Sequence, residues 1–268
     1  MVDNAFKAIC DIFARHSIDE VSSLPISCTE PYRPYMLDEK DYRSCIVFLI
    51  PYLTPENKPV HISKYAAVRD YHMYTKELYE SLTGELATAF PEHIFKCFAD
   101  CSPVNEKLAA ARSGLGVIGK SSLLINKRYG SYVFIGSVVT TLDIGMEAKE
   151  AQSCISCGKC IQACPGKCLG SSDFTGCISY ISQKKERSTS DMALLKKLSC
   201  AWGCDVCQDV CPMNKKVDFS PISFFSHMIL SDPSSEEIAA MSDEEFSERA
   251  FSWRGRKVII DNLQNVGR

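Results

Sequence analysis

The sequence lacks long apolar runs and lacks a large excess of charge of either sign. No hydrophobic stretch approaches the length needed to cross a bilayer, and the first residues have the spacing of an amphipathic helix without the cleavage region of a signal peptide. The formal net charge is only −3, which excludes a protein that coats nucleic acid through a strongly basic surface. We therefore expect a cytoplasmic protein that does not associate with membranes. We also expect a monomer.

Cysteine, in contrast, is abundant and unevenly distributed. The chain of 268 residues holds 15 cysteines, and ten of them fall between residues 154 and 211. In a reducing compartment, cysteines so clustered are more readily metal ligands than disulfide partners. This stretch is therefore predicted to bind metal.

The hydrophobic pattern outside the cysteine-rich stretch predicts a fold of the α+β class. Phe6, Ile9 and Phe13 recur at helical spacing, whereas "CIVFLIPYL" at 45–53 is rich in strand formers. Ser102 is expected to cap a helix that has Pro103 at its first position and closes at Gly114. In chain order, the expected helices are 1–17, 70–90, 103–113, 234–246 and 250–264, and the expected strands are 45–53, 93–100, 122–126 and 131–142.

Changes in composition divide the chain into three predicted domains. Residues 1–145 mix helices and strands, as in an α/β domain. Residues 146–219 are rich in cysteine, small residues and lysine, which marks a separate metal-binding unit. Residues 220–268 are expected to form a short helical C-terminal tail.

Residues 154–165, "CISCGKCIQACP", have the cysteine spacing of a bacterial ferredoxin. Cys154, Cys157, Cys160 and Cys164 fall at C-x2-C-x2-C-x3-C-P, in which three thiolates bind one cluster and the fourth binds a second. Iron in such clusters favours soft thiolate ligands. The run therefore predicts two [4Fe-4S] clusters in a ferredoxin-like domain.

A second, incomplete copy of this run lies at 200–212, "CAWGCDVCQDVCP". Cys204, Cys207 and Cys211 are in register, but Ala201 stands where a further cysteine is expected. By the crossing pattern of two-cluster ferredoxins, Cys211 completes the first cluster, and Cys204 and Cys207 join Cys164 on the second. Spacing leaves the eighth ligand open between Cys168, Cys177 and Cys200.

Other readings of these motifs fit less well. Zinc sites use separated C-x2-C pairs rather than a triplet followed by a fourth cysteine and proline. The C-x3-C-x2-C pattern that begins at Cys200 is typical of radical S-adenosylmethionine enzymes, but only 61 residues follow Cys207. "GLGVIG" at 114–119 follows a helix and precedes a strand, the reverse of a dinucleotide site. "DYH" at 70–72 lacks the later glycine of a cobalamin-binding D-x-H-x-x-G box.

Taken together, these motifs resemble the epoxyqueuosine reductase family, cobalamin-dependent iron-sulfur enzymes of queuosine-tRNA biosynthesis that are related to reductive dehalogenases. The stretches that carry the resemblance span most of the chain in order. They are "YAAVRDYH" (65–72), "DCSPVNEKLAAARSGLGVIGKSSLLIN" (100–126), "GSYVFIG" (130–136), the first cysteine run, "GCISYIS" (176–182) and "WGCDVCQDVCPMN" (202–214).

The resemblance implies a nitroreductase-like N-terminal domain that holds cobalamin. It also implies Cys177 as the eighth cluster ligand, with cluster two near the corrin and cluster one toward solvent. Electrons from a ferredoxin- or flavodoxin-type donor would enter at the first cluster and end on cobalt.

For the active site, the resemblance implies that Asp100 donates a proton, a role that requires a carboxyl pKa raised by burial. From the residues alone, Asp100 would instead help to cap the helix expected at Ser102 and Pro103. Further residues implied near the cobalamin are Arg69, Tyr71, Ser102, Lys120 and Ser121.

The sequence departs from the family pattern at several positions. Residues 25–45 are compressed, Ser137 stands where the family commonly has glutamate, and Asp261 replaces an arginine. Fewer basic residues weaken the case for tRNA, because phosphate contacts supply most nucleic-acid affinity. The expected activity is thus reductive deoxygenation of epoxyqueuosine in tRNA or of a related, smaller substrate. The alternatives are a ferredoxin-like electron carrier without corrinoid chemistry and a zinc-binding module.

Overall fold

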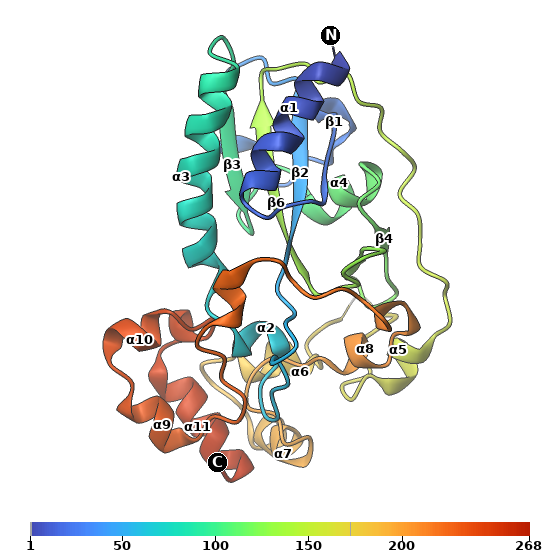
Figure 1. The fold of residues 1–268 in the computed structure, drawn as a ribbon. Helices are drawn as coiled ribbons and strands as arrows, with labels where there is room; N and C mark the ends of the chain where they lie inside the picture. Colours follow the sequence, from blue (N-terminus) through green and yellow to red (C-terminus); the bar gives the residue numbers. More distant parts are fainter. Residues whose placement is uncertain (1, 172) are drawn as a thin grey trace. The chain divides into compact units, whose positions relative to one another are not determined.

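The computed structural model describes residues 2–171 and 173–268, and the chain divides into two compact units (Figure 1). Each unit is assembled from segments that are distant in sequence. The first unit comprises Met1–Pro51, Tyr74–Ser156 and Lys216–Ile222, and the second comprises Tyr52–Met73, Cys157–Lys215 and Ser223–Arg268. The three-domain division expected from composition stays a prediction.

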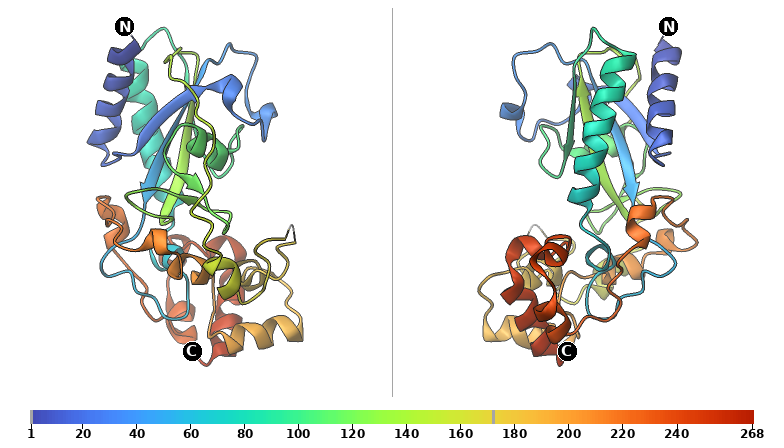
Figure 2. Two further views of the ribbon diagram at one scale, coloured as in Figure 1. Left: turned by 90° about the vertical axis from the view of Figure 1, so that its right-hand side faces the viewer. Right: turned by 60° about the vertical axis from the view of Figure 1, so that its left-hand side comes forward.

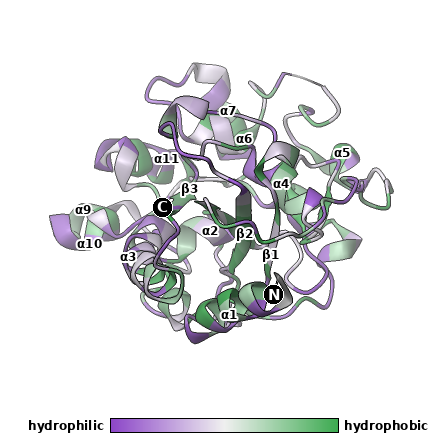
Figure 3. Ribbon diagram, turned by 90° about the horizontal axis from the view of Figure 1, so that it is seen from above, coloured by the Kyte–Doolittle hydropathy of each residue, from purple (hydrophilic) through white to green (hydrophobic). Residues whose placement is uncertain are grey.

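The first unit is built on an antiparallel sheet with the strand order β1-β2-β6-β3. Its strands are β1 (Val21–Pro25), β2 (Ser44–Pro51), β3 (Phe95–Ala99) and β6 (Val133–Thr140). Every residue of β2 is buried, and Figure 3 shows this strand in hydrophobic colour. A strand covered on both faces requires a continuous apolar run rather than an alternating one, and "CIVFLIP" supplies it.

Helices cover both faces of this sheet (Figure 2). On one face Phe48 of β2 packs against Phe13 of α1 (Val2–Arg15), with ring centroids 4.9 Å apart, and against Tyr79 of α3 (Tyr71–Ala89), at 6.3 Å. On the other face the apolar cluster joins Val47 and Leu49 to α4 (Glu106–Arg112). Because successive side chains of a strand point to opposite faces, β2 contributes core side chains to both faces of the sheet.

The strands include two that the sequence pattern did not predict. β1, "VSSLP", has two serines, and their hydroxyls are hydrogen-bonded to carbonyls distant in sequence: Ser22 donates to the Ser113 carbonyl at 2.7 Å and Ser23 donates to the Cys45 carbonyl at 3.2 Å. The second is β4 (Val117–Ile118), which pairs with β5 (Leu124–Ile125) in a separate small sheet. The strand expected at 122–126 therefore pairs with β4 rather than with β6.

Helix α4 begins later than the sequence predicted. Its N-cap is Asn105, whose side chain accepts the Leu108 N–H at 3.3 Å, and not Ser102. The Ser102 hydroxyl instead pairs with the Ser137 hydroxyl at 3.0 Å. The capping role considered for Asp100 is thus wrong, because no helix opens at Ser102. Gly114 follows the helix with φ +89°, as expected for a residue that closes it.

The second unit consists of short helices connected by loops. They are α2 (Lys64–Ala67), α5 (Lys159–Ala163), α6 (Ile178–Ser182), α7 (Thr189–Lys197), α8 (Val206–Asp209), α9 (Ser235–Ala240), α10 (Asp243–Ser247) and α11 (Arg256–Val266). Single-turn 3-10 helices of this unit lie at Pro212–Asn214, Ser223–Ser226 and Ser252–Arg254. The first unit has two more, at Ile26–Cys28 and Pro34–Met36. No helix among the described residues has the length and apolar character needed to span a membrane.

Both helices predicted near the C-terminus are interrupted. The one expected at 234–246 divides into α9 and α10, because Ser242 forms a capping box with Glu245 that starts a new helix. The one expected at 250–264 is broken by Gly255, whose φ is +86°. Helix α11 then packs on the fully buried Trp202, and its buried Asn262 donates to the carbonyls of Ser182 and Ala201, both at 2.8 Å.

Candidate functional site

Four cysteines from distant loops of the second unit lie near one another. Burial raises the pKa of the Cys204 thiol to about 11, and the neighbouring thiols of Cys177 and Cys164 act in the same direction. Burial likewise raises the pKa of Cys207 to about 12, with contributions from Cys204 and Cys177. Buried thiols of this kind bind metal as thiolates, with loss of their protons. The expected second set, Cys164, Cys177, Cys204 and Cys207, is therefore gathered in one place.

A close backbone contact holds two of these loops together. A Cβ added to Gly166 would lie 1.7 Å from the Gly176 carbonyl oxygen, so the backbone segments after Cys164 and before Cys177 are in direct contact. Only glycine permits so close an approach. Neither glycine was singled out in the sequence, because the contact joins residues that belong to different loops.

Two further cysteines lie beside this set. The Cys168 sulfur is 3.5 Å from the Cys164 sulfur, and burial together with that contact raises the Cys168 pKa to about 12. The Cys200 thiol donates to the Gly203 carbonyl at 2.9 Å. The Cys200 thiol is thus already hydrogen-bonded to the backbone, whereas the Cys168 thiol contacts Cys164, a predicted cluster ligand.

The cysteines expected on the first cluster are more dispersed. Cys160 lies in α5, which packs against α8, and Cys160 adds to the electrostatic effect on Cys207. Cys157 precedes α5 and is exposed, and Cys211 follows α8. Cys154 belongs to the first unit, where its N–H donates to the Ile118 carbonyl at 3.1 Å. Among the described residues, no three histidine, cysteine, aspartate or glutamate side chains are arranged to hold a single metal ion.

Asp100 stands on a sharp turn directly after β3 in the first unit. Its φ is +60°, and the next N–H, of Cys101, donates back to the Ala99 carbonyl at 2.6 Å. Aspartate tolerates this left-handed conformation better than most residues. The turn leaves Asp100 exposed.

A buried polar network lies behind this turn. The Ser102 hydroxyl pairs with the Ser137 hydroxyl at 3.0 Å, and Ser137 donates to Glu106 Oε1 at 2.9 Å. Burial raises the pKa of the Glu106 carboxyl to about 7, while hydrogen bonds from the Ser137 hydroxyl and the Asp100 backbone N–H oppose that rise. Glu106 therefore links the Asp100 turn to strand β6.

Glu106 was missed in the sequence. Its only signal there was an acidic residue in the first turn of a helix, which is common at helix N-termini. Ser137, noted in the sequence as a departure from the family pattern, is one of its partners. The network is visible only because β3 and β6 are neighbours in the sheet.

Lys120 and Ser121, expected near a cobalamin, lie in a tight turn of the first unit. The Gly119 N–H donates to the Leu123 carbonyl at 2.8 Å, and Lys120 is exposed. A Cβ on Gly119 would lie 2.9 Å from the Ser121 hydroxyl, and one on Gly116 would lie 2.6 Å from the Ile125 carbonyl. A side chain at either glycine would therefore clash with the chain around it, and glycine permits this close approach.

Arg69 and Tyr71, also expected near a cobalamin, lie in the second unit. Arg69 forms an ion pair with Glu248, with Nε 2.9 Å from Oε2, and its guanidinium lies 4.2 Å from the centre of the Phe224 ring. The ring of Tyr71 lies 4.1 Å from that of His72. Arg69 thus has a structural role in its own unit.

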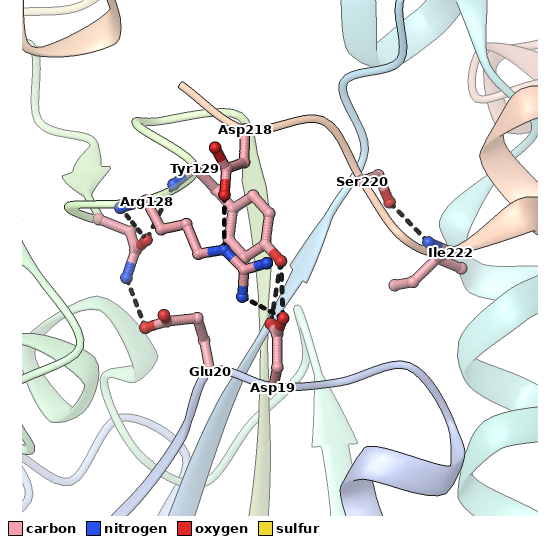
Figure 4. Close-up of polar contacts among 8 residues, drawn as sticks. Asp19, Glu20, Arg128, Tyr129, Asp218, Ser220 and Ile222 are labelled. Atoms are coloured by element: carbon pink, nitrogen blue, oxygen red, sulfur yellow. Dashed lines mark hydrogen bonds and ion pairs between the residues drawn. The ribbon is translucent and has the colours of Figure 1, made fainter. Parts of the chain in front are cut away.

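A separate polar cluster fixes the turn between β5 and β6 (Figure 4). Arg128 forms ion pairs with Asp19 and with Asp218, the latter at 2.7 Å, and the Tyr129 hydroxyl donates to Asp19 at 2.9 Å. Asn126 donates to Glu20 at 2.8 Å. These contacts join three distant segments of the first unit, and they engage Arg128 with carboxylates rather than leaving it to bind an anion.

Comparison with known proteins identifies the family. Two family models match: "Epoxyqueuosine reductase QueG, DUF1730" over residues 38–101, and "4Fe-4S double cluster binding domain" over residues 153–214. A curated protein from Synechocystis, named epoxyqueuosine reductase, is 34% identical over 196 residues, which cover 67% of this chain and 68% of that protein. One of the same name from Gloeobacter violaceus is 30% identical over 245 residues, or 84% of this chain and 75% of that protein.

Some relatives are considerably longer than this chain. The match to the Lactococcus garvieae epoxyqueuosine reductase, at 32% identity, covers 72% of this chain but only 57% of that protein.

Solved structures share the fold. The epoxyqueuosine reductase from Streptococcus thermophilus superposes with a TM-score of 0.78 at 22% identity, covering 96% of this chain and 79% of that one. A crystal structure of epoxyqueuosine reductase with an epoxyqueuosine-modified tRNA-Tyr stem loop superposes with a TM-score of 0.82 at 20% identity, covering 99% and 81%. The curated relatives establish that the chain belongs to the epoxyqueuosine reductase family, and the family model over residues 153–214 establishes that it carries a double 4Fe-4S cluster binding domain.

Proposed function

We propose that this protein reduces epoxyqueuosine in tRNA to queuosine. The single observation that carries the proposal is the match to proteins named epoxyqueuosine reductase over up to 84% of the chain. The thiols gathered in the second unit would hold iron-sulfur clusters, and these clusters would deliver the electrons that a reductase needs. Removal of an epoxide oxygen consumes two electrons and two protons, breaks both C–O bonds and leaves a carbon-carbon double bond and water.

For the clusters, we propose two ligand sets. The first cluster would be held by Cys154, Cys157, Cys160 and Cys211, and the second by Cys164, Cys177, Cys204 and Cys207. The donor set fits, because thiolates are the usual ligands of iron-sulfur clusters, and the mutual electrostatic effects of the Cys164, Cys177, Cys204 and Cys207 thiols support the second set. When bound, the clusters supply single electrons from a ferredoxin- or flavodoxin-type donor.

We further propose that cobalamin binds to a nitroreductase-like first domain, residues 1–145, followed by the cluster domain at 146–219 and a helical tail at 220–268. Asp100 is exposed, and its backbone N–H is hydrogen-bonded to the buried Glu106 carboxyl, as suits a side chain that faces a bound ligand. Ser102, Lys120, Ser121, Arg69 and Tyr71 are the further candidates for holding the cofactor. When bound, cobalamin supplies the strong nucleophile or reductant that cleaves a C–O bond.

In this scheme Asp100 holds the proton that is transferred to the departing epoxide oxygen. Such a donor acts best when its carboxyl is shielded from water by the bound substrate and cofactor. The turn after β3 fixes where that proton is presented. The protein would act as a cytoplasmic monomer, with tRNA as its macromolecular substrate.

Loss of the gene tests the proposal in cells. We expect tRNA from cells without it to accumulate epoxyqueuosine and to lose queuosine, with recovery on re-expression of the wild-type chain. Unchanged queuosine, in cells without a second such reductase, would contradict the proposal. In that case, anaerobic reconstitution with iron, sulfide and cobalamin would separate the alternatives, because an electron carrier gives clusters without a cob(II)alamin spectrum.

A further inference from the structure

Two exposed tyrosines and a half-buried arginine form a small surface at residues 32–35 in the first unit. The side chains of Tyr32 and Tyr35 are 62% and 81% exposed, although burying them would be favourable. The Arg33 guanidinium lies 5.3 Å from the centre of the Tyr32 ring. We call these three residues the Tyr-Arg-Tyr surface.

The backbone of this surface is attached to the segment that follows Asp100. The N–H groups of Tyr32 and Arg33 both donate to the Pro103 carbonyl, at 2.8 and 3.1 Å. Pro31 pairs with Val104 in an isolated antiparallel bridge. The surface is therefore held at a fixed place next to the Asp100 turn rather than on a detached loop.

The charge of the surface is coupled to the turn itself. Interaction with the side chain of Cys101, which directly follows Asp100, raises the Arg33 pKa. Pro34 starts the 3-10 helix Pro34–Met36 and restricts the backbone between the two tyrosines. The tyrosines are thus presented by a constrained backbone, which lowers the entropy lost when a ligand binds.

The chemistry of the surface fits an unpaired nucleotide. Exposed bases of single-stranded RNA are recognised by stacking on aromatic side chains, and a guanidinium binds phosphate through paired hydrogen bonds. A protein with a net charge of −3 must bind RNA through local contacts of this kind rather than through its overall charge. The surface also lies in the stretch, residues 25–45, where the sequence departs from the family pattern.

We propose that Tyr32, Arg33 and Tyr35 dock an unpaired nucleotide of an RNA loop, with the tyrosines stacking on its base and Arg33 binding its phosphate. This inference rests on the proposed function, in which the RNA is the substrate whose modified base is presented to Asp100. The surface would then recognise the loop of the tRNA rather than its helical stem.

Binding of a fluorescein-labelled anticodon stem-loop RNA, with guanine in place of the modified base, tests the surface without turnover. Fluorescence anisotropy is measured on the reconstituted full chain. We expect Tyr32→Ala and Tyr35→Ala each to weaken binding about tenfold or more, the effect of removing one stacking side chain. Tyr32→Phe keeps the ring and should bind like the wild type.

The charge contact is tested by the salt dependence of the same binding. Arg33→Gln should reduce the slope of log affinity against log salt by about 0.7, as expected for one lost phosphate contact on single-stranded RNA. Lys127→Gln makes the same change of charge at an exposed position of the same unit and should leave the slope unchanged. A matching RNA duplex without a loop should not distinguish any variant from the wild type.

The outcomes separate this inference from the proposed function. Alanine variants that bind the stem-loop as tightly as the wild type, or a wild type that does not bind it, would overturn the inference. Weakened binding in a protein that does not reduce epoxyqueuosine would support the surface and contradict the function. Normal turnover with an unchanged KM in all variants would support the function and overturn the surface. Unchanged melting temperatures exclude misfolding as the cause of a loss.

Discussion

Asp100 owes its exposed position to a single residue conformation. Its φ of +60° turns the chain out of β3, so the carboxyl is presented to solvent while the next residues return to the buried network. Spacing or composition could not have shown this arrangement. The role proposed for Asp100 comes from the resemblance, and the structure adds that the helix it was considered to cap begins later, with Asn105 as its N-cap.

Replacing Asp100 by asparagine should reduce turnover of epoxyqueuosine by about 10²- to 10⁴-fold, the range associated with a positioned general acid. Asparagine tolerates the same backbone conformation, so the turn should persist. Single-turnover rates, measured with iron content and cofactor spectrum, check this prediction. Full activity in Asp100→Asn would show that another group supplies the proton.

Glu106 should make stability depend on pH. Its folded-state pKa of about 7 lies above the ordinary glutamate value of 4.5 because of burial, so between these values the folded protein holds a proton that the unfolded chain has released. Stability therefore decreases as the pH rises from about 4.5 to 7 and is constant above that range. Asp100, whose charge raises the Glu106 pKa, and the Cys45 thiol, whose pKa Glu106 raises, are the titratable groups facing this carboxyl.

Glu106→Gln removes this titration while keeping the hydrogen bonds. The difference in unfolding free energy between variant and wild type should favour the variant increasingly from pH 5 to about pH 7, by on the order of 1–3 kcal/mol given about 1.4 kcal/mol per pKa unit, and should then stay level to pH 8. Denaturant titrations across this pH range provide the measurement. Parallel pH profiles for the two proteins would contradict the assigned titration.

At the level of elements, sequence pattern predicted best where burial is uniform. β2 and α3 were anticipated because a continuous apolar run and a long helical pattern leave little choice. β1 was not anticipated, because its serines satisfy themselves through contacts with Ser113 and Cys45 that are distant in sequence. The helices near the C-terminus are shorter than predicted. The capping box at Ser242 and the glycine at 255 each interrupt a pattern that is otherwise helical.

Helix α11 should stabilise the loop that leads into Cys204. Asn262 is fully buried and donates at 2.8 Å to the carbonyl of Ala201 in this loop and to that of Ser182, the last residue of α6. Asn262→Ala should lower the unfolding free energy by about 1–3 kcal/mol, because a buried carbonyl without a donor is costly. The Asn262→Ala variant should also retain less iron than the wild type during thermal denaturation.

Asn265 on the same helix provides the matched control. It is less buried and makes a single hydrogen bond, to the Met192 carbonyl at 2.8 Å, so Asn265→Ala should cost about 1 kcal/mol or less. Equal losses in the two variants would show that α11 contributes only generic helix packing.

The cysteine loops give the sharpest test at this scale. Cys177→Ser should remove or degrade the second cluster, because the thiol of Cys177 lies near those of Cys204 and Cys207. Cys200→Ser should be tolerated, since the Cys200 thiol is already bonded to the Gly203 carbonyl. Iron analysis and electron paramagnetic resonance of the reduced proteins report the outcome.

Cys168 makes this test more informative. Its sulfur lies 3.5 Å from that of Cys164, so it is the thiol best placed to replace a lost ligand. Residual cluster in Cys177→Ser that disappears in the Cys168→Ser, Cys177→Ser double variant would reveal such replacement. A normal cluster in both would mean that Cys177 is not the ligand.

For the whole molecule, the sequence predicted the chemistry better than the architecture. The cysteine spacings predicted a double-cluster domain, which the family model over residues 153–214 confirms, because ligand geometry acts over a few residues; the seven ligands that spacing assigns stay a prediction. The eighth ligand and Glu106 depend on contacts between segments far apart in the chain, as does the close approach of Gly166 to Gly176. Neither of the two units is a continuous segment, an organisation that local composition cannot reveal.

Turnover by the purified protein tests the central claim most directly. The chain is reconstituted anaerobically with iron, sulfide and cobalamin, given a low-potential reductant and incubated with tRNA that carries epoxyqueuosine, and the nucleosides are then measured by mass spectrometry. The account predicts multiple-turnover formation of queuosine that requires cobalamin and is lost in Asp100→Asn. Epoxyqueuosine left unchanged by a protein that holds both clusters and the corrin would contradict it.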